Sequence, residues 1–330
     1  MSGLKISGLK ISGLRCLAAG CLLVLAACAA SPSPTPDVPL SRDSLRALRW
    51  IAPGADKVRA LTTEPVSCRN PDEAMARIAL DDGLSFSTVD IGQLAFESPA
   101  LLGGAAARMG LSCASCHLNG RNNPDFFVEG ASGAPGTADV TNSLFSKTRG
   151  NGAFDPVPIP DIAARDGKQI KDRLSPEFHT KVHGLIVDEF DGREPGEQIF
   201  QEVVAYMDGL VPCVDPGVRR PLTASRDMVA ARKAFLIAGF VSTPDDKRLM
   251  ARAARERLER LNERFIAASQ SDVRAALLDA SQKIAAWMDA PDDANAVQVE
   301  AALKLAEARV TRDAPRSLYE PGVLRVALER

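Results

Sequence analysis

Residues 113–117 of this 330-residue chain read Cys-Ala-Ser-Cys-His, and this pentapeptide constrains the fold more than any other feature. Two thiols three positions apart can reach the two vinyl groups of one haem, and the next residue offers an imidazole to its iron. Attachment at Cys113 and Cys116 would make His117 the proximal axial ligand. The alternatives are a thioredoxin-like pair, a zinc half-site or a plain disulfide. No second pair follows at zinc-finger spacing, so the motif predicts one covalent haem c.

An apolar run over residues 16–27 follows three basic residues and is too short to span a membrane comfortably, which is typical of an export signal. It ends in Leu-Ala-Ala-Cys and resembles the bacterial lipobox, in which the cysteine is lipidated and becomes the mature N-terminus. The sequence therefore predicts a signal peptide over 1–27 and a lipid anchor on Cys28. No aspartate follows Cys28, which favours the outer membrane and a periplasmic location. A plain signal peptide cut near Ala30 is the alternative.

Two cysteines, Cys68 and Cys213, belong to neither the signal nor the haem motif. They lie in proline-flanked segments on either side of residues 113–117. Export places the chain in an oxidising compartment, where spare thiols tend to pair. We therefore expect a disulfide between them, with two free thiols as the alternative. Closing so long a loop would stabilise the fold by at most about 5 kcal/mol in the chain-entropy model.

Composition excludes several classes of function. Apolar residues make up 45% of the chain and charged residues 25%, as in an ordinary soluble globular protein. Only the signal-like run is apolar enough to enter a membrane, so the chain is no multi-spanning transporter. The formal net charge of −2 gives no electrostatic reason to expect nucleic acid as a partner.

Several segments between residues 70 and 215, on both sides of the haem motif, are similar to segments of a known protein family. They are residues 91–96, 111–117, 139–145, 154–161 and 187–192, followed by an amphipathic segment, 200–210. Together they resemble one haem domain of the bacterial di-heme cytochrome c peroxidase family. The resemblance implies a cytochrome c-like fold in which 200–210 is a final helix that packs across the first. Family members carry two haems, whereas this chain has one motif, so the two-haem peroxidase cycle does not carry over.

The sequence does not identify the sixth iron ligand. His179 and His183 are four residues apart and would share one helix face, and Met207 lies on the expected final helix. These three are the candidate distal ligands, although a solvated surface for the histidines and a packing role for Met207 are the more ordinary readings. An open or water-ligated iron is the remaining alternative. A filled site favours electron transfer, and an open one favours binding of peroxide or small gases.

The C-terminal region has a helical pattern throughout. Thr243-Pro244 followed by two aspartates is a strong helix start, and apolar residues then recur at steps of three and four, with breaks at Gln270 and Pro291. This pattern predicts an antiparallel helical bundle or hairpin. The arginines between residues 252 and 264 interleave with glutamates, so we expect a solvated, ion-paired helix surface. The alternative is that this face attracts an acidic partner, lipid headgroups or the acidic haem domain.

The sequence thus predicts an all-α protein with four regions: a signal peptide (1–27), a tether rich in proline and serine (28–41), a cytochrome c-like haem domain (42–221) and a helical domain (222–330). The expected function is periplasmic electron transfer by an exported mono-haem c-type cytochrome, with another cytochrome or a quinol-linked complex as redox partner. A peroxidase-like enzyme with an open distal site is one alternative. A surface scaffold with a structural haem is the other.

Overall fold

The computed structural model describes residues 40–70, 78–79, 84–165 and 169–330. The expected signal peptide, Cys28 and nearly all of the tether lie outside these residues. Within the described part, helices make up most of the regular structure, which confirms the all-α class. None of these described helices is long and apolar enough to cross a bilayer.

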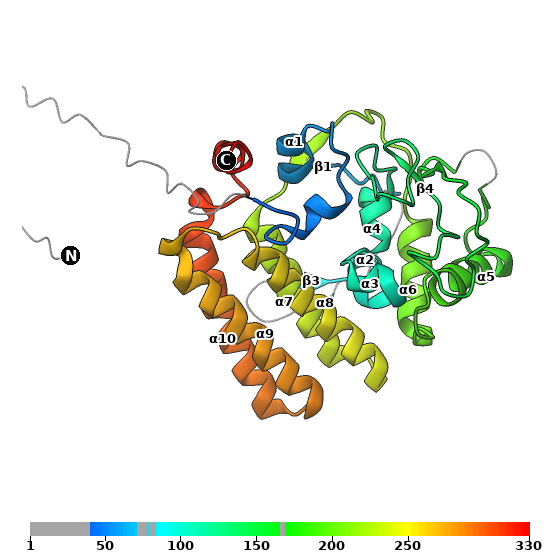
Figure 1. The fold of residues 1–330 in the computed structure, drawn as a ribbon. Coiled ribbons are helices and arrows are strands. Elements are labelled where there is room, and N and C mark those ends of the chain that lie inside the picture. The colour runs from blue at the N-terminus through cyan, green and yellow to red at the C-terminus, as the bar shows by residue number, and fades with distance from the viewer. Residues whose placement is uncertain (1–39, 71–77, 80–83, 166–168) are drawn as a thin grey trace, which may run out of the picture. The chain divides into compact units, whose positions relative to one another are not determined.

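Short helices alternate with long loops in the part of the fold that precedes residue 222 (Figure 1). Its helices are η1 (Arg46–Trp50), α1 (Lys57–Thr62), α2 (Thr88–Phe96), η3 (Pro99–Leu101), α3 (Gly104–Arg108), α4 (Cys113–Cys116), η4 (Leu118–Gly120), α5 (Pro176–Gly184), the π-helical turn η5 (Leu185–Glu189) and α6 (Glu197–Asp208). The strands form small antiparallel pairs: β1 (Thr63–Pro65) with β6 (Arg219–Pro221), β2 (Ile78–Ala79) with β3 (Ser85–Phe86), and β4 (Thr137–Ala138) with β5 (Val157–Pro158).

Helices α2 and α6 cross at very close range. A Cβ atom on Gly92 of α2 would lie 1.8 Å from the backbone oxygen of Glu202 on α6, so only glycine fits at the crossing. One turn further along α2, the rings of Phe96 and Tyr206 lie with their centroids 5.2 Å apart. The segment 200–210, expected to pack across the first helix, lies within and just beyond α6 and packs on α2, which follows η1 and α1 along the chain.

The C-terminal part is a bundle of neighbouring helices (Figure 1). They are α7 (Ala224–Phe240), α8 (Pro244–Asn262), α9 (Ser271–Asp289) and α10 (Asp293–Asp313), followed by α11 (Pro321–Leu328). Helix α7 packs on α8, α8 on α9 and α9 on α10. The turns between them are short, so neighbours run antiparallel. The breaks expected at Gln270 and Pro291 fall at the start of α9 and between α9 and α10.

The start of α8 shows why these residues form a helix. Thr243 caps it, because its side-chain oxygen accepts a hydrogen bond from the backbone N–H of Asp246 at 3.1 Å. The apolar residues at steps of four and three are buried, as the periodicity predicts; they are Met250, Ala254, Leu258 and Leu261. Helix α8 therefore has one face in the core along its whole length.

One hydrophobic core joins the two parts of the fold. Helix α2 packs against both α7 and α8, and the buried side chains of α2, α6 and the bundle form a continuous cluster. A separate cluster joins Leu45 and Leu61 near the start of the described chain to Leu318 and Leu324 near its end. Residues on either side of the expected boundary at 221 thus fold around a common interior.

The arginine-rich face of α8 is largely an internal contact, and the expectation of a solvated surface is wrong for it. Arg257 forms ion pairs with Glu97 of the α2 end and, at 2.9 Å, with Asp227 of α7. Arg264 is buried and lies over the ring of Tyr319, 4.9 Å from its centroid. The sequence pattern could not show this, because the partners come from distant segments that cover the face.

Candidate functional site

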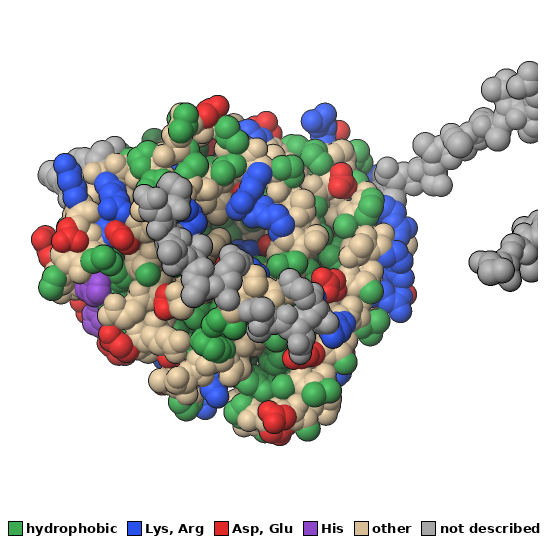
Figure 2. All heavy atoms as spheres, turned by 180° about the vertical axis from the view of Figure 1, so that it is seen from behind, with side chains coloured by type: hydrophobic (Ala, Val, Ile, Leu, Met, Phe, Trp, Pro, Cys, Tyr) green, Lys and Arg blue, Asp and Glu red, His purple; other side chains and the backbone are tan. Residues whose placement is uncertain are grey.

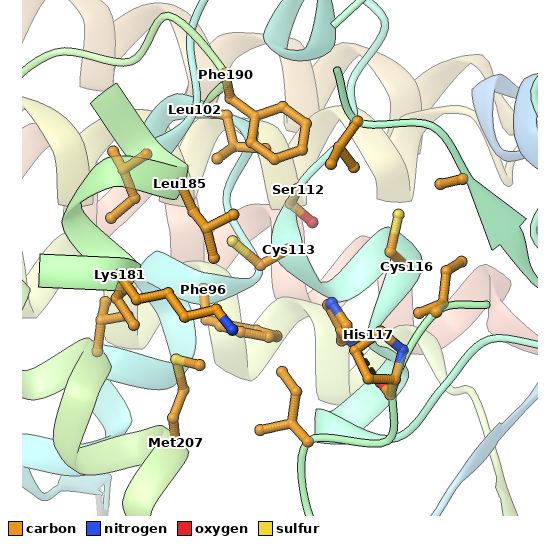
Figure 3. A pocket seen from close by; sticks show the side chains of 18 of the residues that line it. Phe96, Leu102, Ser112, Cys113, Cys116, His117, Lys181, Leu185, Phe190 and Met207 are labelled. Carbon is orange, nitrogen blue, oxygen red and sulfur yellow. Dashed lines mark hydrogen bonds between the residues drawn. The ribbon is translucent and has the colours of Figure 1, made fainter. Parts of the chain in front are cut away.

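A cavity of about 400 Å³ opens in the part of the fold that precedes the bundle, and its lining is mostly apolar (Figure 3). Its size is within the range of small-molecule and cofactor sites. Cys113, Cys116 and His117 all line it. In Figure 3 they lie on one side of the space, and Met207 and Lys181 lie on the other.

The fold of α4 brings the two thiols together. The cysteines occupy the first and last positions of this single turn, so their side chains leave on the same side. Ser112 closes the start of the turn, because its backbone N–H donates to the hydroxyl of Ser115 at 3.0 Å. At the other end, the backbone N–H of His117 donates to the carbonyl of Cys113 at 2.9 Å.

Two buried asparagines hold this turn in place. The side-chain amide of Asn123 donates to the backbone oxygen of Ser115 at 2.8 Å, and that of Asn119 donates to the backbone oxygen of Pro65 at 2.8 Å. Asn119 has a φ of 52°, a left-handed conformation that asparagine tolerates better than most residues. The motif is therefore fixed to β1 as well as to its own loop.

His117 is held in one orientation by a backbone group. Its Nδ1 atom lies 3.0 Å from the carbonyl oxygen of Pro160. A carbonyl only accepts hydrogen bonds, so Nδ1 is the donor, and Nε2 is left with a free lone pair in the neutral ring. Burial lowers the pKa of His117 to about 4, so the ring is neutral near pH 7. A neutral imidazole with Nδ1 bound to a carbonyl is the usual arrangement of a metal-ligating histidine.

The chemistry of the thiols argues against the other readings of the motif. Burial raises the pKa of Cys113 to about 12 and moves that of Cys116 well above its ordinary value. A thioredoxin-like pair requires the opposite shift. The two cysteines are also free thiols and not a disulfide. Among the described residues, no group of three or more histidine, cysteine or acidic side chains is placed to hold a metal ion.

The three distal candidates lie in different surroundings. Met207 of α6 lines the cavity and is buried. His183 lies at the surface, where its Nε2 is 2.8 Å from a carboxylate oxygen of Glu194; Figure 2 shows histidine and acidic side chains close together on one face. His179 packs edge-on against Phe200, with ring centroids 5.8 Å apart. Neither histidine lines the cavity, so the structure does not bring them to His117.

The remaining predicted pair, Cys68 and Cys213, is joined by a disulfide. The backbone N–H of Val211 donates to the carbonyl of Cys68 at 3.0 Å, which aligns the two segments beside the bond. The disulfide therefore ties the segment after β1 to the segment after α6.

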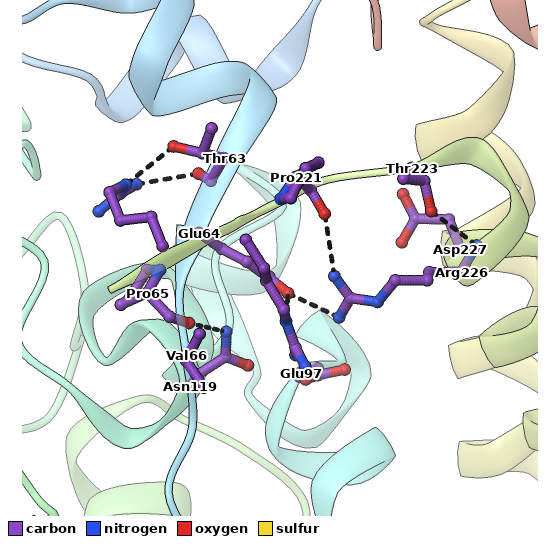
Figure 4. Close-up of polar contacts among 12 residues, drawn as sticks. Thr63, Glu64, Pro65, Val66, Glu97, Asn119, Pro221, Thr223, Arg226 and Asp227 are labelled. Atoms are coloured by element: carbon purple, nitrogen blue, oxygen red, sulfur yellow. Dashed lines mark hydrogen bonds and ion pairs between the residues drawn. The ribbon is translucent and has the colours of Figure 1, made fainter. Parts of the chain in front are cut away.

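Ion pairs at β1 connect this region to the bundle (Figure 4). Glu64 pairs with Arg220 at 2.8 Å and with Arg226 of α7 at 2.6 Å. The next residue along the strand, Pro65, accepts the hydrogen bond from Asn119. Strand β1 thus links the loop after the haem motif to the first helix of the bundle.

Sequence reasoning missed two basic residues that line the cavity, Arg173 and Lys181. Arg173 is 1% exposed, although the segment around it has no apolar periodicity to indicate burial. Its Nε atom is buried and has no hydrogen-bond partner in the described part of the chain. A lone arginine in a loop is ordinarily solvated, so the sequence carried no signal for this position.

No protein-family model, curated protein or solved structure matches the chain. The functional conclusion therefore depends on the cavity and its residues.

Proposed function

We propose that this chain is an exported c-type cytochrome that binds one haem covalently through Cys113 and Cys116, with His117 as its proximal iron ligand, and that it transfers electrons. One observation carries the proposal: both thiols and a neutral imidazole oriented by Pro160 line a single apolar cavity. The proposal includes a cytochrome c-like domain related to one half of a di-heme cytochrome c peroxidase. The crossing of α2 and α6 at Gly92 supports that relationship.

The residues of the cavity fit a haem. Each thiol would add across one vinyl group: the S–H bond breaks, C–S and C–H bonds form, and no electrons are gained or lost. His117 keeps Nε2 for the iron because Pro160 occupies Nδ1. The apolar walls would exclude water from the ring. When bound, the haem supplies an iron that exchanges one electron.

The lining favours electron transfer over peroxide chemistry. Cleavage of peroxide needs a side chain that moves a proton near the open side of the iron. Among the described residues, no carboxylate lines the cavity, and the charged side chains there are Arg173 and Lys181. Met207 is the only one of the three distal candidates in the lining, so we propose its sulfur as the sixth ligand. A filled sixth position is typical of an electron carrier.

The mouth of the cavity supports exchange with a partner protein. Val157 and Leu185 line the cavity and are also exposed, Val157 to 60%. An electron carrier needs such an exposed apolar rim for brief contact with its partner. We propose another cytochrome or a quinol-linked complex as that partner, in the periplasm, with Cys28 holding the chain to the outer membrane by a lipid.

An optical spectrum of the ferric protein tests this function. We expect a low-spin spectrum that cyanide and hydrogen peroxide leave unchanged, together with reversible reduction by a mild reductant. The variant Met207→Ala should become high-spin, whereas Met109→Ala should not, because Met109 does not line the cavity. High-spin wild-type iron that reacts with peroxide would contradict electron transfer and favour the peroxidase. A haem that no reductant reduces would favour the scaffold.

A further inference from the structure

Arg173 is the one arginine whose side chain is almost entirely enclosed beside the cavity. It is 1% exposed and lies over the ring of Phe178, with its guanidinium carbon 5.4 Å from the ring centroid. Its two Nη groups donate to the backbone oxygens of Met207, at 3.1 Å, and Ile162, and a third bond of 3.2 Å reaches the side-chain oxygen of Gln169. These bonds use three of the five N–H donors of the guanidinium; of the other two, the one on Nε is buried without a partner in the described residues.

No carboxylate balances the charge of this guanidinium. Arg173 forms no ion pair within the described part of the chain, and the two aspartates that influence it are already engaged by other arginines. Asp161 pairs with Arg121 at 2.7 Å, and Asp208 pairs with Arg165 at 3.1 Å. Burial, followed by repulsion from Arg165, lowers the pKa of Arg173 to about 10, so the group is still charged near pH 7.

An enclosed charge without a counter-ion is costly, because the group has lost its hydration and gained no opposite charge. A buried polar group without a partner is rare in folded proteins and calls for an explanation; for a residue that lines a cavity, an acid group on the bound molecule supplies one. Three hydrogen bonds fix the plane of the guanidinium, and Arg173 is one of the residues that line the cavity. We therefore expect the molecule in the cavity to carry a negatively charged hydrogen-bond acceptor.

We infer that Arg173 binds a carboxylate of the molecule in the cavity through its guanidinium group, and that this carboxylate is a haem propionate. The inference rests on the proposed function, since it takes haem as the ligand. More generally, it assigns the cavity to a large apolar ring that carries at least one acid group. Arg173 is thus a positioning residue that fixes the rotation of the ring and raises the reduction potential of its iron.

The effect on the potential follows from charge. Removing the guanidinium leaves the propionate as an unbalanced negative charge beside the iron, and this charge destabilises the more electron-rich ferrous state. The potential should therefore fall. A merely structural arginine, which holds the backbone oxygens of Ile162 and Met207, would change stability without this change in potential.

The test compares three variants by redox titration of the haem-loaded protein. Arg173→Gln should lower the equilibrium constant for reduction about tenfold, which is 59 mV for a one-electron couple. Arg173→Lys keeps the charge and should retain most of the potential. Arg165→Gln is the matched control, because it removes a neighbouring charge that does not line the cavity; its shift should be less than about a third as large.

A shift for Arg173→Gln no larger than that for Arg165→Gln would overturn the inference. If Arg173→Gln fails to fold, a structure of the haem-loaded wild type decides instead: a propionate oxygen within about 3.2 Å of a guanidinium nitrogen of Arg173 supports the inference, and a guanidinium that no propionate reaches refutes it. Failure of the proposed function is a different result, because the wild type itself would then carry no covalent haem.

Discussion

At the scale of single residues, the site depends on groups that only the fold brings together. The Cys-x-x-Cys-His pattern identifies two thiols and an imidazole from local spacing alone. The carbonyl that orients His117 belongs to Pro160, 43 positions away, and a backbone oxygen leaves no trace in a sequence. Arg173 was missed for a related reason: its burial comes from the cavity wall and not from any periodic pattern around it.

Gly92 should tolerate no side chain. Gly92→Ala places a Cβ atom 1.8 Å from the backbone oxygen of Glu202, and neither backbone can move without separating α2 from α6. Such overpacking costs about 1–3 kcal/mol or more of unfolding free energy, measured by urea denaturation. Gly239→Ala in α7 is the control, because nothing lies within 4 Å of its Cβ; it should be neutral or stabilise by about 0.5–1 kcal/mol. Equal effects of the two changes would contradict the close crossing.

Asp246 should make the stability depend on pH. It is buried, neither carboxylate oxygen accepts a hydrogen bond from the described residues, and burial raises its pKa above that of the unfolded chain. A raised folded pKa means that the ionised form opposes folding, so stability rises as the pH falls through that pKa.

The variant Asp246→Asn should therefore gain about 1–3 kcal/mol at pH 7, and the gain should shrink as the pH is lowered. Thermal unfolding at several pH values measures it. Asp245→Asn, at an exposed position, should change little. A gain that is independent of pH would show that Asp246 is not charged in the fold.

At the scale of elements, local signals predicted the helices well and their contacts poorly. The start of α8 at Thr243 and the turn before α10 could be predicted because capping and apolar spacing are local properties. The docking of α8 onto α2 could not, since it depends on Arg257 meeting Glu97 and Asp227 from distant segments. An arginine beside glutamates has the same sequence signature on an exposed helix and at a buried contact.

Arg257 should matter more than any exposed ion pair of the bundle. Arg257→Gln leaves Glu97 and Asp227 without their counter-charge in a covered position, and breaking such a pair costs about 3–5 kcal/mol. Arg248→Gln is the control, because its pair with Asp245 is exposed and worth less than about 1 kcal/mol. Chemical denaturation of both variants provides the comparison. A small loss for Arg257→Gln would mean that α8 docks through apolar contacts alone.

At the scale of the whole molecule, the helices before and after residue 221 share one core, and we propose that the first part holds a haem and that Cys28 carries a membrane anchor. The shared core means that the bundle stabilises the region around α2, and β1 connects the bundle to the loop after the haem motif. Apolar periodicity predicted the helices of the bundle. It did not predict that helices on both sides of the expected boundary at 221 would contribute side chains to one core.

The proposed lipid anchor on Cys28 belongs to this scale, because it would set where the molecule works. Cys28→Ala should leave the chain without lipid and move it from the membrane fraction to the soluble periplasmic fraction, because the proposed attachment is then lost. Labelling with a radioactive fatty acid and fractionation measure this. Cys21→Ala is the control and should not change the labelling. Equal labelling of wild type and Cys28→Ala would contradict the anchor.

The most direct test of the central claim is the intact mass of the purified mature chain under denaturing conditions, after expression with a haem-attachment system. The account predicts a mass increase of one haem for the wild type and none for the double variant Cys113→Ser/Cys116→Ser. The double variant Cys68→Ser/Cys213→Ser, which loses only the disulfide, should keep the haem. A wild-type chain at its unmodified mass would contradict the assignment of the cavity to a covalent haem.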